Sequence, residues 1–272
     1  MSPSNIRIEG KKYPITALRK CSRRDLRLDK DFFLFLSALK LGDVHAVEKC
    51  AREMAKAISS TLPKDFRKNR KDYIIINHPA TTQTSVAVSL VNSIARILQM
   101  QKGEIVLENI YFGNTSYYDL SPTAKRKILE KKLHYYGPRV RNKRIILIDD
   151  ISATGSALKM SSKLLLGKKP KSLSLFVYLK LENNIEKEIT AYQYKQKGIK
   201  YLVQLMNNKD NIITSRLLSL ILSLSPSETA LLLGKVSRER RKRLIRELTD
   251  YTKLYSKVYW THGFSESALI KK

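Results

Sequence analysis

Apolar residues change their spacing several times along the chain, and each spacing predicts one kind of element. Near the N-terminus they crowd the segment DFFLFLSALK, and from Val44 to Ile58 they recur at helical intervals. Pro63 and the charged run KDFRKNRKD interrupt this pattern and predict a linker. We therefore expect residues 1–64 to form a helical N-terminal extension.

The middle of the chain alternates short apolar runs with longer amphipathic segments. Five runs predict strands: YIIIN at 73–77, EIVLENI at 104–110, RIILI at 144–148, SLSLFVYL at 172–179 and KYLVQL at 200–205. Helices are predicted over 85–100, from a Ser121 N-cap followed by Pro122, over 155–166, and between the last two strands. Strands that alternate with helices favour a parallel sheet covered on both faces. We therefore expect residues 65–206 to form an α/β domain.

From Asn211 onward the pattern predicts helices only. The segment NIITSRLLSLILSL has helical apolar spacing, and the sequence from Ser225 to Glu228 is that of a capping box with proline at the first helical position. In the last long segment Leu244 and Leu248 fall on one face. We expect residues 207–272 to form a basic helical C-terminal extension.

The stretch IILIDDISATGSALKM, residues 145–160, carries the clearest chemistry. A buried strand ends in Asp149 and Asp150, and small hydroxyl residues around Gly155 lead into a helix. Ligands of open parallel sheets bind outside the carboxyl ends of the strands. The unpaired N–H groups at a helix start favour a phosphate, and glycine lets the backbone approach it closely.

Two carboxylates beside a phosphate cradle would repel that phosphate unless they face another group. Vicinal ribose hydroxyls, bridged to a magnesium ion, are suitable partners. The stretch therefore predicts a ribose 5-phosphate site. The alternative is an ordinary helix N-terminus with acidic caps. A Walker A loop is excluded, because no Gly-Lys-Ser/Thr follows.

This run resembles the phosphoribosyl pyrophosphate (PRPP) motif of type I phosphoribosyltransferases, and the resemblance covers residues 65–206. It implies a parallel sheet of the type I phosphoribosyltransferase kind, and transfer of phosphoribosyl from PRPP to a nitrogen acceptor with release of pyrophosphate. Asp149 and Asp150 would bind the ribose hydroxyls and Mg²⁺. The phosphate-binding residues would be Ser152, Ala153, Thr154, Gly155 and Ser156.

The same resemblance implies two segments for pyrophosphate. A basic loop before the PRPP strand would bring Arg126 and Lys127 over the leaving group. The segment NHPATTQTS, residues 77–85, would contribute His78, Thr81 and Thr82. The glycines usual in that second loop are missing, which bears on catalysis more than on PRPP binding. Alanine at position 153, where some purine-using relatives have an aspartate base, disfavours a purine acceptor.

Charge adds a second class of partner. Lys and Arg total 52 against 24 acids, a formal net charge of +28. Such a field attracts polyanions, although a solvated basic surface explains it equally well. The run RERRKR at 238–243 is open to the same two interpretations, phosphate contact or a solvated helix face. Aromatic residues from Tyr255 to Phe264 would stack on bases or, as we favour, dock on the sheet domain or on a dimer partner.

Two functions follow. The first is an active, magnesium-dependent phosphoribosyltransferase. The second is a non-catalytic effector that senses PRPP or a nucleotide and binds nucleic acid or a nucleoprotein partner, as in anti-phage systems of the retron type. Without a long apolar segment or a signal-like start, we expect a cytoplasmic protein with free thiols at Cys21 and Cys50 and no membrane partner. A homo-oligomer and the acceptor base are left open.

Overall fold

The computed structural model describes residues 4–22, 24–25, 29–78, 85–107, 133–182 and 186–255. Its strands form a seven-stranded sheet of order β1-β2-β7-β6-β3-β4-β5. The strands are β1 (Ser4–Ile8), β2 (Lys11–Cys21), β3 (Tyr73–Asn77), β4 (Gln101–Leu107), β5 (Leu133–Tyr136), β6 (Arg144–Ser152) and β7 (Ser172–Leu181). The helices are α2 (Lys30–Leu41), α3 (Val44–Thr61), α4 (Val86–Leu98), α6 (Ser156–Leu166), α7 (Glu186–Asn207), α8 (Ser215–Leu222), α9 (Pro226–Lys235) and α10 (Arg238–Tyr255), with short 3₁₀ turns η1 (Lys64–Arg67) and η2 (Arg70–Asp72).

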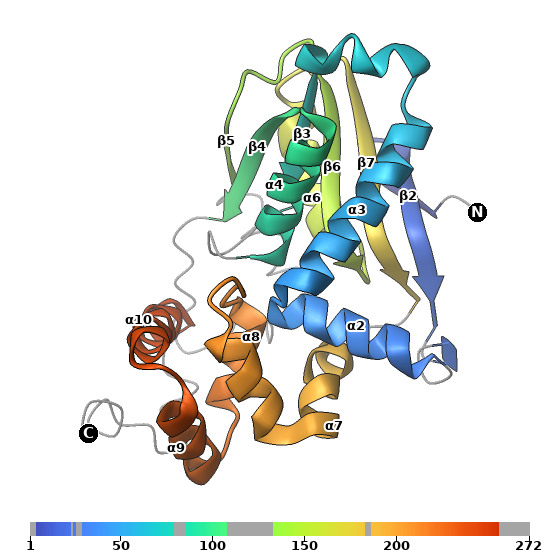
Figure 1. The fold of residues 1–272 in the computed structure, drawn as a ribbon. Helices are drawn as coiled ribbons and strands as arrows, with labels where there is room; N and C mark the ends of the chain where they lie inside the picture. The colour runs from blue at the N-terminus through green and yellow to red at the C-terminus, as the bar shows by residue number, and fades with distance from the viewer. Residues whose placement is uncertain are drawn as a thin grey trace.

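The central strands of the sheet are parallel. Strands β2, β7, β6, β3 and β4 pair in parallel, whereas β1 and β5 join the two edges antiparallel. The carboxyl ends of all the parallel strands therefore lie at the same end of the sheet, near α2 and α8 in Figure 1. This arrangement confirms the predicted α/β fold with a mostly parallel sheet.

Helices cover both faces of the sheet (Figure 1). On one face α2, α3 and α4 pack through Leu36, Met54 and Leu90 against strand residues that include Ile75 and Phe176. On the other face α6 packs through Leu158 and Leu165. The strands β3 and β6 lie between these layers, which is why their sequences are continuous apolar runs and not alternating ones.

The C-terminal helices α7 to α10 build a third apolar cluster, which also includes Leu41 at the end of α2. The capping box is confirmed: the Ser225 side chain accepts from the Glu228 amide, and the Glu228 side chain accepts from the Ser225 amide. Leu244 and Leu248 face the cluster, as their spacing predicts. No helix among the described residues is long and apolar enough to cross a membrane. Cys21 and Cys50 are buried free thiols, as expected.

The prediction that residues 1–64 are helical throughout was wrong for the first part. Strands β1 and β2 form a hairpin whose turn, at Glu9 and Gly10, has positive φ at both residues, as in a type I′ hairpin turn. Ile15 and Ala17 on β2 are buried, and the residues around them are more exposed. This alternation with a period of two is the strand signal that the helical interpretation missed.

The strand predicted at residues 200–205 was also wrong, because these residues form the end of α7. Leu202, Leu205 and Met206 enter the third cluster at helical spacing, and a short apolar run alone does not separate a buried helix from a strand. Strand β5 was not predicted. The helix start at Ser121 lies outside the described residues. The boundaries proposed at 64 and 206 stay predictions, although α7 runs across the second one.

Candidate functional site

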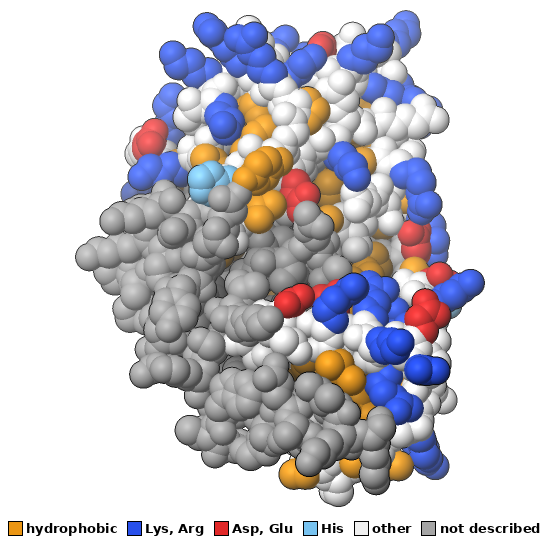
Figure 2. Space-filling model, turned by 90° about the vertical axis from the view of Figure 1, so that its left-hand side faces the viewer, with side chains coloured by type: hydrophobic (Ala, Val, Ile, Leu, Met, Phe, Trp, Pro, Cys, Tyr) orange, Lys and Arg blue, Asp and Glu red, His pale blue; other side chains and the backbone are white. Residues whose placement is uncertain are grey.

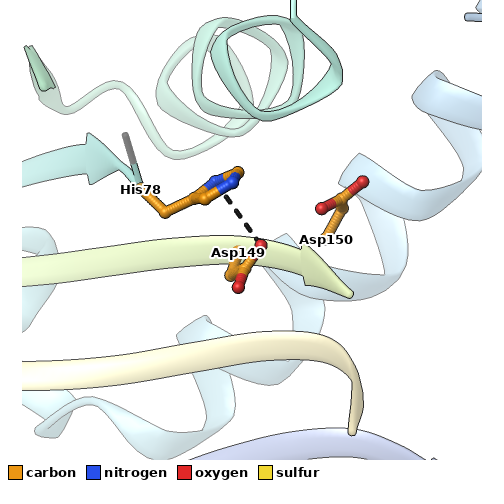
Figure 3. Close-up of side chains that lie close together, drawn as sticks. All are labelled: His78, Asp149 and Asp150. Atoms are coloured by element: carbon orange, nitrogen blue, oxygen red, sulfur yellow. Dashed lines mark ion pairs between the residues drawn. The ribbon is translucent and has the colours of Figure 1, made fainter. Parts of the chain in front are cut away.

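The carboxyl ends of β6 and β3 bring three titratable side chains together (Figure 3). Asp149 and Asp150 are buried near the end of β6, and Asn77 ends β3 opposite Ile148. The next residue, His78, donates its amide to the Ile148 carbonyl at 2.8 Å, which places its ring beside the acids. His78 Nδ1 lies 3.4 Å from Asp149 Oδ1.

Asn77 fixes the end of β3 against its neighbour. Its side-chain Nδ2 donates to the carbonyls of His78 at 2.7 Å and Ile105 at 3.1 Å, and its Oδ1 accepts from the Ile105 amide. The side chain is almost fully buried, so these bonds satisfy polar atoms that water does not reach. The polar end of β3 is therefore a rigid support for His78.

The pleat of β6 separates the two acids. Ile145 and Leu147 belong to the core on the α6 side, whereas Ile146 and Ile148 belong to the core under α2 and α3. Side chains alternate between the faces of a strand, so Asp150 continues the second series and faces α2. Asp149 thus lies next to His78 and Asp150 next to Lys40, although the two carboxylates still interact with each other.

Asp150 forms a buried ion pair with a lysine of α2. Lys40 Nζ lies 2.8 Å from Asp150 Oδ2, and the two side chains are 9% and 3% exposed. The other carboxylate oxygen, Oδ1, accepts from the Ile151 amide at 2.8 Å. Burial by itself would raise the pKa of Asp150, but the charges of Lys40 and His78 outweigh burial and lower this pKa to about 2. Asp150 is therefore a charged, fully engaged carboxylate.

The turn after the acids leaves the start of α6 open. Gly155 precedes the helix with φ of 73°, in the left-handed region that glycine favours, and no side chain caps the helix N-terminus. Five other helices, α2, α3, α4, α8 and α9, each have a side chain that accepts a first-turn amide. In α6 the Ser156 amide donates to Thr154 Oγ1 at 3.3 Å, and among the described residues no N-cap side chain accepts a first-turn amide. Amides in this first turn are therefore available to an anion.

A buried hydroxyl lies beside this helix start. Ser152 is 3% exposed, and its Oγ has no hydrogen-bond partner among the residues that the structure describes. A Cβ placed on Gly155 would lie 4.0 Å from this oxygen, so the hydroxyl borders the turn. A buried hydroxyl without a partner costs free energy, and a bound anion would satisfy it.

Lys180 of β7 holds the other side of the turn. Its Nζ donates to the carbonyl of Ala153, and Ser152 and Lys180 are partners in the register of β6 and β7. Burial lowers the pKa of the Lys180 ammonium, and the charge of Asp149 opposes this shift. A positive charge therefore lies close to both the turn and the first acid.

The structure thus brings together most of the residues that the sequence singled out. His78, Asp149 and Asp150 offer ligand atoms within 4.8 Å of one another, and residues 152–156 lead from the end of β6 through a turn into α6. Thr81, Thr82, Arg126 and Lys127 lie outside the described residues. The ligand roles of all these residues stay predictions.

Sequence reasoning missed Lys40 and Lys180. Lys40 had a usable signal, because it falls on the apolar face of DFFLFLSALKL at a helical spacing from Phe33 and Leu36. A lysine on such a face is almost never fully buried without an acidic partner. The sequence does not say which acid this partner is.

The three side chains suit magnesium only in part. Mg²⁺ prefers oxygen ligands and keeps several of its waters. Asp149 fits this preference, since its carboxylate lies at the strand end beside His78. Asp150 fits less well, because Lys40 and the Ile151 amide already engage its two oxygens. Of the two acids, Asp149 is therefore the better candidate ligand for a magnesium ion.

Comparisons with known proteins give weak likenesses only. No protein family and no curated protein matches the sequence. A purine phosphoribosyltransferase from Pyrococcus horikoshii is 13% identical over 50% of this chain and 83% of its own, with a TM-score of 0.32. A hypoxanthine phosphoribosyltransferase from Staphylococcus aureus is 14% identical over 50% and 75%, with a TM-score of 0.32. One from Trypanosoma cruzi, in complex with the product IMP, is 11% identical over 52% and 75%, with a TM-score of 0.33. Likenesses this low carry no argument about activity, so the functional inference rests on the chain's own residues.

Proposed function

We propose that this protein binds PRPP at the carboxyl end of β6 and transfers its phosphoribosyl group to a nitrogen acceptor, releasing pyrophosphate. The observation that carries the proposal is the open start of α6 next to two acids. An uncapped helix N-terminus and the partnerless Ser152 hydroxyl suit a phosphate, and acids at a strand end suit ribose hydroxyls. This combination supports a sugar phosphate over a free inorganic anion.

Each side chain has a role in this proposal. The amides of the first turn of α6 and the hydroxyl of Ser152 would hold the 5-phosphate. Asp149 would accept hydrogen bonds from the ribose hydroxyls, with His78 holding its carboxylate in place. Lys180 would fix the turn through the Ala153 carbonyl. When bound, Mg²⁺ would neutralise part of the pyrophosphate charge.

Catalysis in this proposal comes from positioning and electrostatics. The sugar develops positive charge as pyrophosphate departs, and buried carboxylates nearby stabilise such charge. Asp149 is buried, so its charge acts with little screening by solvent, whereas the charge of Asp150 is largely balanced by Lys40. Arg126 and Lys127 remain our candidates for covering the pyrophosphate. Ala153 has no group that transfers a proton, which favours an acceptor other than a purine.

Asp149→Asn is the variant that tests the ligand site. PRPP with magnesium, at about a hundred times its dissociation constant, should stabilise the wild-type protein by ~2.7 kcal/mol. Asp149→Asn should lose most of this stabilisation, whereas Asp72→Asn, an exposed acid at the far end of the sheet, should keep it. Asp150 is unsuitable for this test, because its replacement would leave the buried Lys40 ammonium without its counterion. An unchanged response in Asp149→Asn would place the ligand elsewhere.

Pyrophosphate release separates the transferase from a sensor. The assay uses a panel of bases, nucleosides and nucleotides, with wild type, Asp149→Asn, and the pair Arg126→Ala with Lys127→Ala. A transferase should lose turnover in the pair far more than PRPP affinity, because a covering loop acts mainly in the transition state. Release that survives in Asp149→Asn would count against this site.

A second candidate function is a PRPP- or nucleotide-sensing effector without transferase activity. Lys40 favours it, since the ammonium already neutralises one of the two acids that a magnesium–ribose complex would use. In this case PRPP would stabilise the protein, Asp149→Asn would remove the effect, and no acceptor would release pyrophosphate. Binding of the nucleic acid or nucleoprotein partner would then be the functional output.

A further inference from the structure

A strongly basic surface covers the amino end of the parallel sheet, opposite the candidate site. Three short segments there precede β3, β6 and β7, a fourth leads into the start of β4, and nine exposed basic residues lie on these four segments. These residues, which we call the amino-end surface, are Arg67, Lys68, Lys71, Lys102, Arg139, Arg141, Lys168, Lys169 and Lys171. Figure 2 shows Lys and Arg side chains gathered at this upper end of the molecule.

Hydrogen bonds hold three of these segments side by side. The Asn142 amide donates to the Lys169 carbonyl at 3.1 Å, and the Lys171 amide donates to the Lys143 carbonyl at 2.8 Å. Lys143 Nζ in turn donates to the Lys71 carbonyl at 2.7 Å. Adjacent strands lie about 4.8 Å apart, so the segments form a narrow row. The backbone of the row is fixed, and the exposed basic side chains project from it.

The charge of this row is not balanced within the row. The segments 66–72, 99–102, 137–143 and 167–171 contain one acid, Asp72, whose carboxylate lies 3.5 Å from Lys143 Nζ. Like charges gathered on one end of a fold repel one another and weaken its stability. A bound polyanion would remove that cost and release its own counterions.

The basic run of α10 is a weaker candidate for the same role. Arg240 is buried and donates to the carbonyls of Met206 and Asn211, so it is part of the structure of the C-terminal helices. The exposed bases Arg238, Lys242 and Arg246 share the helix with Glu239, Glu247 and Asp250. The mixture of signs on α10 makes it a suitable control.

An exposed aromatic ring lies at the same end of the sheet. Tyr136 is 52% exposed, and it ends β5, which runs antiparallel to β4 and so reaches the edge where β4 begins. Arg139 and Arg141 follow it in the chain. An aromatic ring among basic residues offers a platform on which an unpaired base can stack.

We propose that the amino-end surface binds a single-stranded nucleic acid, with the basic residues on its phosphates and Tyr136 on a base. Five steps of β6, at about 3.3 Å each, place this surface roughly 17 Å from Asp149. A nucleic acid bound to this surface would therefore leave the PRPP site open. The proposal stands apart from transferase activity, because none of these residues belongs to the candidate site.

The test compares two sets of four substitutions that remove the same charge. The first set is Arg67→Gln, Lys68→Gln, Lys169→Gln and Lys171→Gln. The control set is Lys235→Gln, Arg238→Gln, Lys242→Gln and Arg246→Gln, all exposed in the C-terminal helices. Affinity of the full chain for a labelled 20-nucleotide single strand, of DNA and of RNA, is measured between 50 and 300 mM salt.

Loss of four phosphate contacts should reduce the log–log salt slope by about 3 and the affinity at 0.1 M salt by roughly 600-fold. The control set should change affinity by less than about 10-fold, and both sets should keep the stabilisation by PRPP. Equal losses in the two sets would overturn the location, because they would reflect net charge alone. Absence of wild-type binding at 50 mM salt would overturn the surface itself.

Two further arms test the kind of ligand. Tyr136→Ala should weaken single-strand binding by about 5- to 100-fold and leave duplex binding unchanged, since only unpaired bases offer a free face for stacking. Equal losses for single strand and duplex would refute the stacking role. Vesicles with a third of anionic lipid replace the nucleic acid in the last arm. Tighter binding to these vesicles than to the strands would assign the surface to a membrane and refute the proposal.

Discussion

Replacement of Lys40 by methionine should destabilise the protein strongly, although this residue lies outside the segment that carries the PRPP motif. Methionine keeps most of the length and volume of the lysine stem, so the change removes the charge with little loss of packing. The Lys40 ammonium lies 2.8 Å from Asp150 Oδ2, with both side chains over 90% buried. The substitution therefore leaves a buried carboxylate without its counterion.

Two estimates from the structure bound the size of the effect. The pKa of Asp150 is lowered to about 2 against a usual value near 3.9, which corresponds to roughly 2 to 3 kcal/mol for the charged form. Removing one partner of a buried pair costs more, about 3 to 5 kcal/mol, because desolvation of the remaining charge is no longer offset. We expect a loss of 3 to 5 kcal/mol in the free energy of unfolding at pH 7.

The expected pH dependence has a definite sign. A carboxylate with a lowered folded pKa contributes stability above its unfolded pKa, and this contribution is lost as the pH falls toward the folded pKa. The wild-type advantage over Lys40→Met should therefore be largest near pH 7. It should shrink first as the unpaired Asp150 of the variant, whose pKa burial raises, takes up a proton, and shrink further between about pH 4 and pH 2 as Asp150 of the wild type is protonated. Urea denaturation in magnesium-free buffer, at several pH values, measures both free energies.

A double-mutant cycle and a matched control complete the experiment. Lys40→Met with Asp150→Leu should be far less destabilised than the two single changes summed, by at least about 2 kcal/mol, because it strands no charge. Lys56→Met, at an exposed position of α3, should stay within about 0.5 kcal/mol of wild type. A loss below 1 kcal/mol in Lys40→Met, or a loss that does not vary with pH, would refute the buried ion pair.

Two further variants each test the role of one buried polar side chain. Ser152→Ala should leave the unfolding free energy of the ligand-free protein unchanged or raise it by about 1 kcal/mol, because it removes a buried hydroxyl without a partner. The same variant should show a smaller thermal shift with PRPP. A less stable protein with a full thermal shift would contradict this prediction. Arg240→Met should lower the free energy of unfolding by at least about 3 kcal/mol in urea denaturation, because it removes charged hydrogen bonds to the buried carbonyls of Met206 and Asn211. The exposed control Arg238→Met should lower it by less than about 0.5 kcal/mol. Similar losses for the two arginines would show that burial does not distinguish them.

The part of the site that the sequence predicted is the part that is local in the chain. A buried strand, a glycine turn and a helix follow one another within residues 145–166 as predicted, although β6 continues past the predicted end at 148 to Ser152 and so includes both acids. Parallel strands then place His78 beside Asp149 through the pairing of β3 with β6. Both steps follow from strand geometry, which a sequence pattern captures.

The part that the sequence did not predict depends on contacts between distant segments. Lys40 has no local feature that names Asp150 as its partner, and Lys180 meets the Ala153 carbonyl only because β7 lies next to β6. The hairpin β1-β2 was missed for another reason. It adds to the sheet beyond β7, and its alternation is short enough for adjacent helical segments to obscure it.

The ion pair also links the site to the C-terminal helices, which the sequence had set apart as an extension. The Thr214 hydroxyl donates to the carbonyl of Lys40 at 3.0 Å, and the Ile212 amide donates to the carbonyl of Gly42 at 2.9 Å. Gly42 has φ of 88°, and a Cβ there would lie 2.2 Å from the Ile212 carbonyl oxygen. The end of α2 thus contacts Asp150 of β6 on one side and the loop before α8 on the other. Since Arg240 of α10 binds the same loop at Asn211, a change in the packing of the C-terminal helices would act on Asp150 through the backbone that carries Lys40.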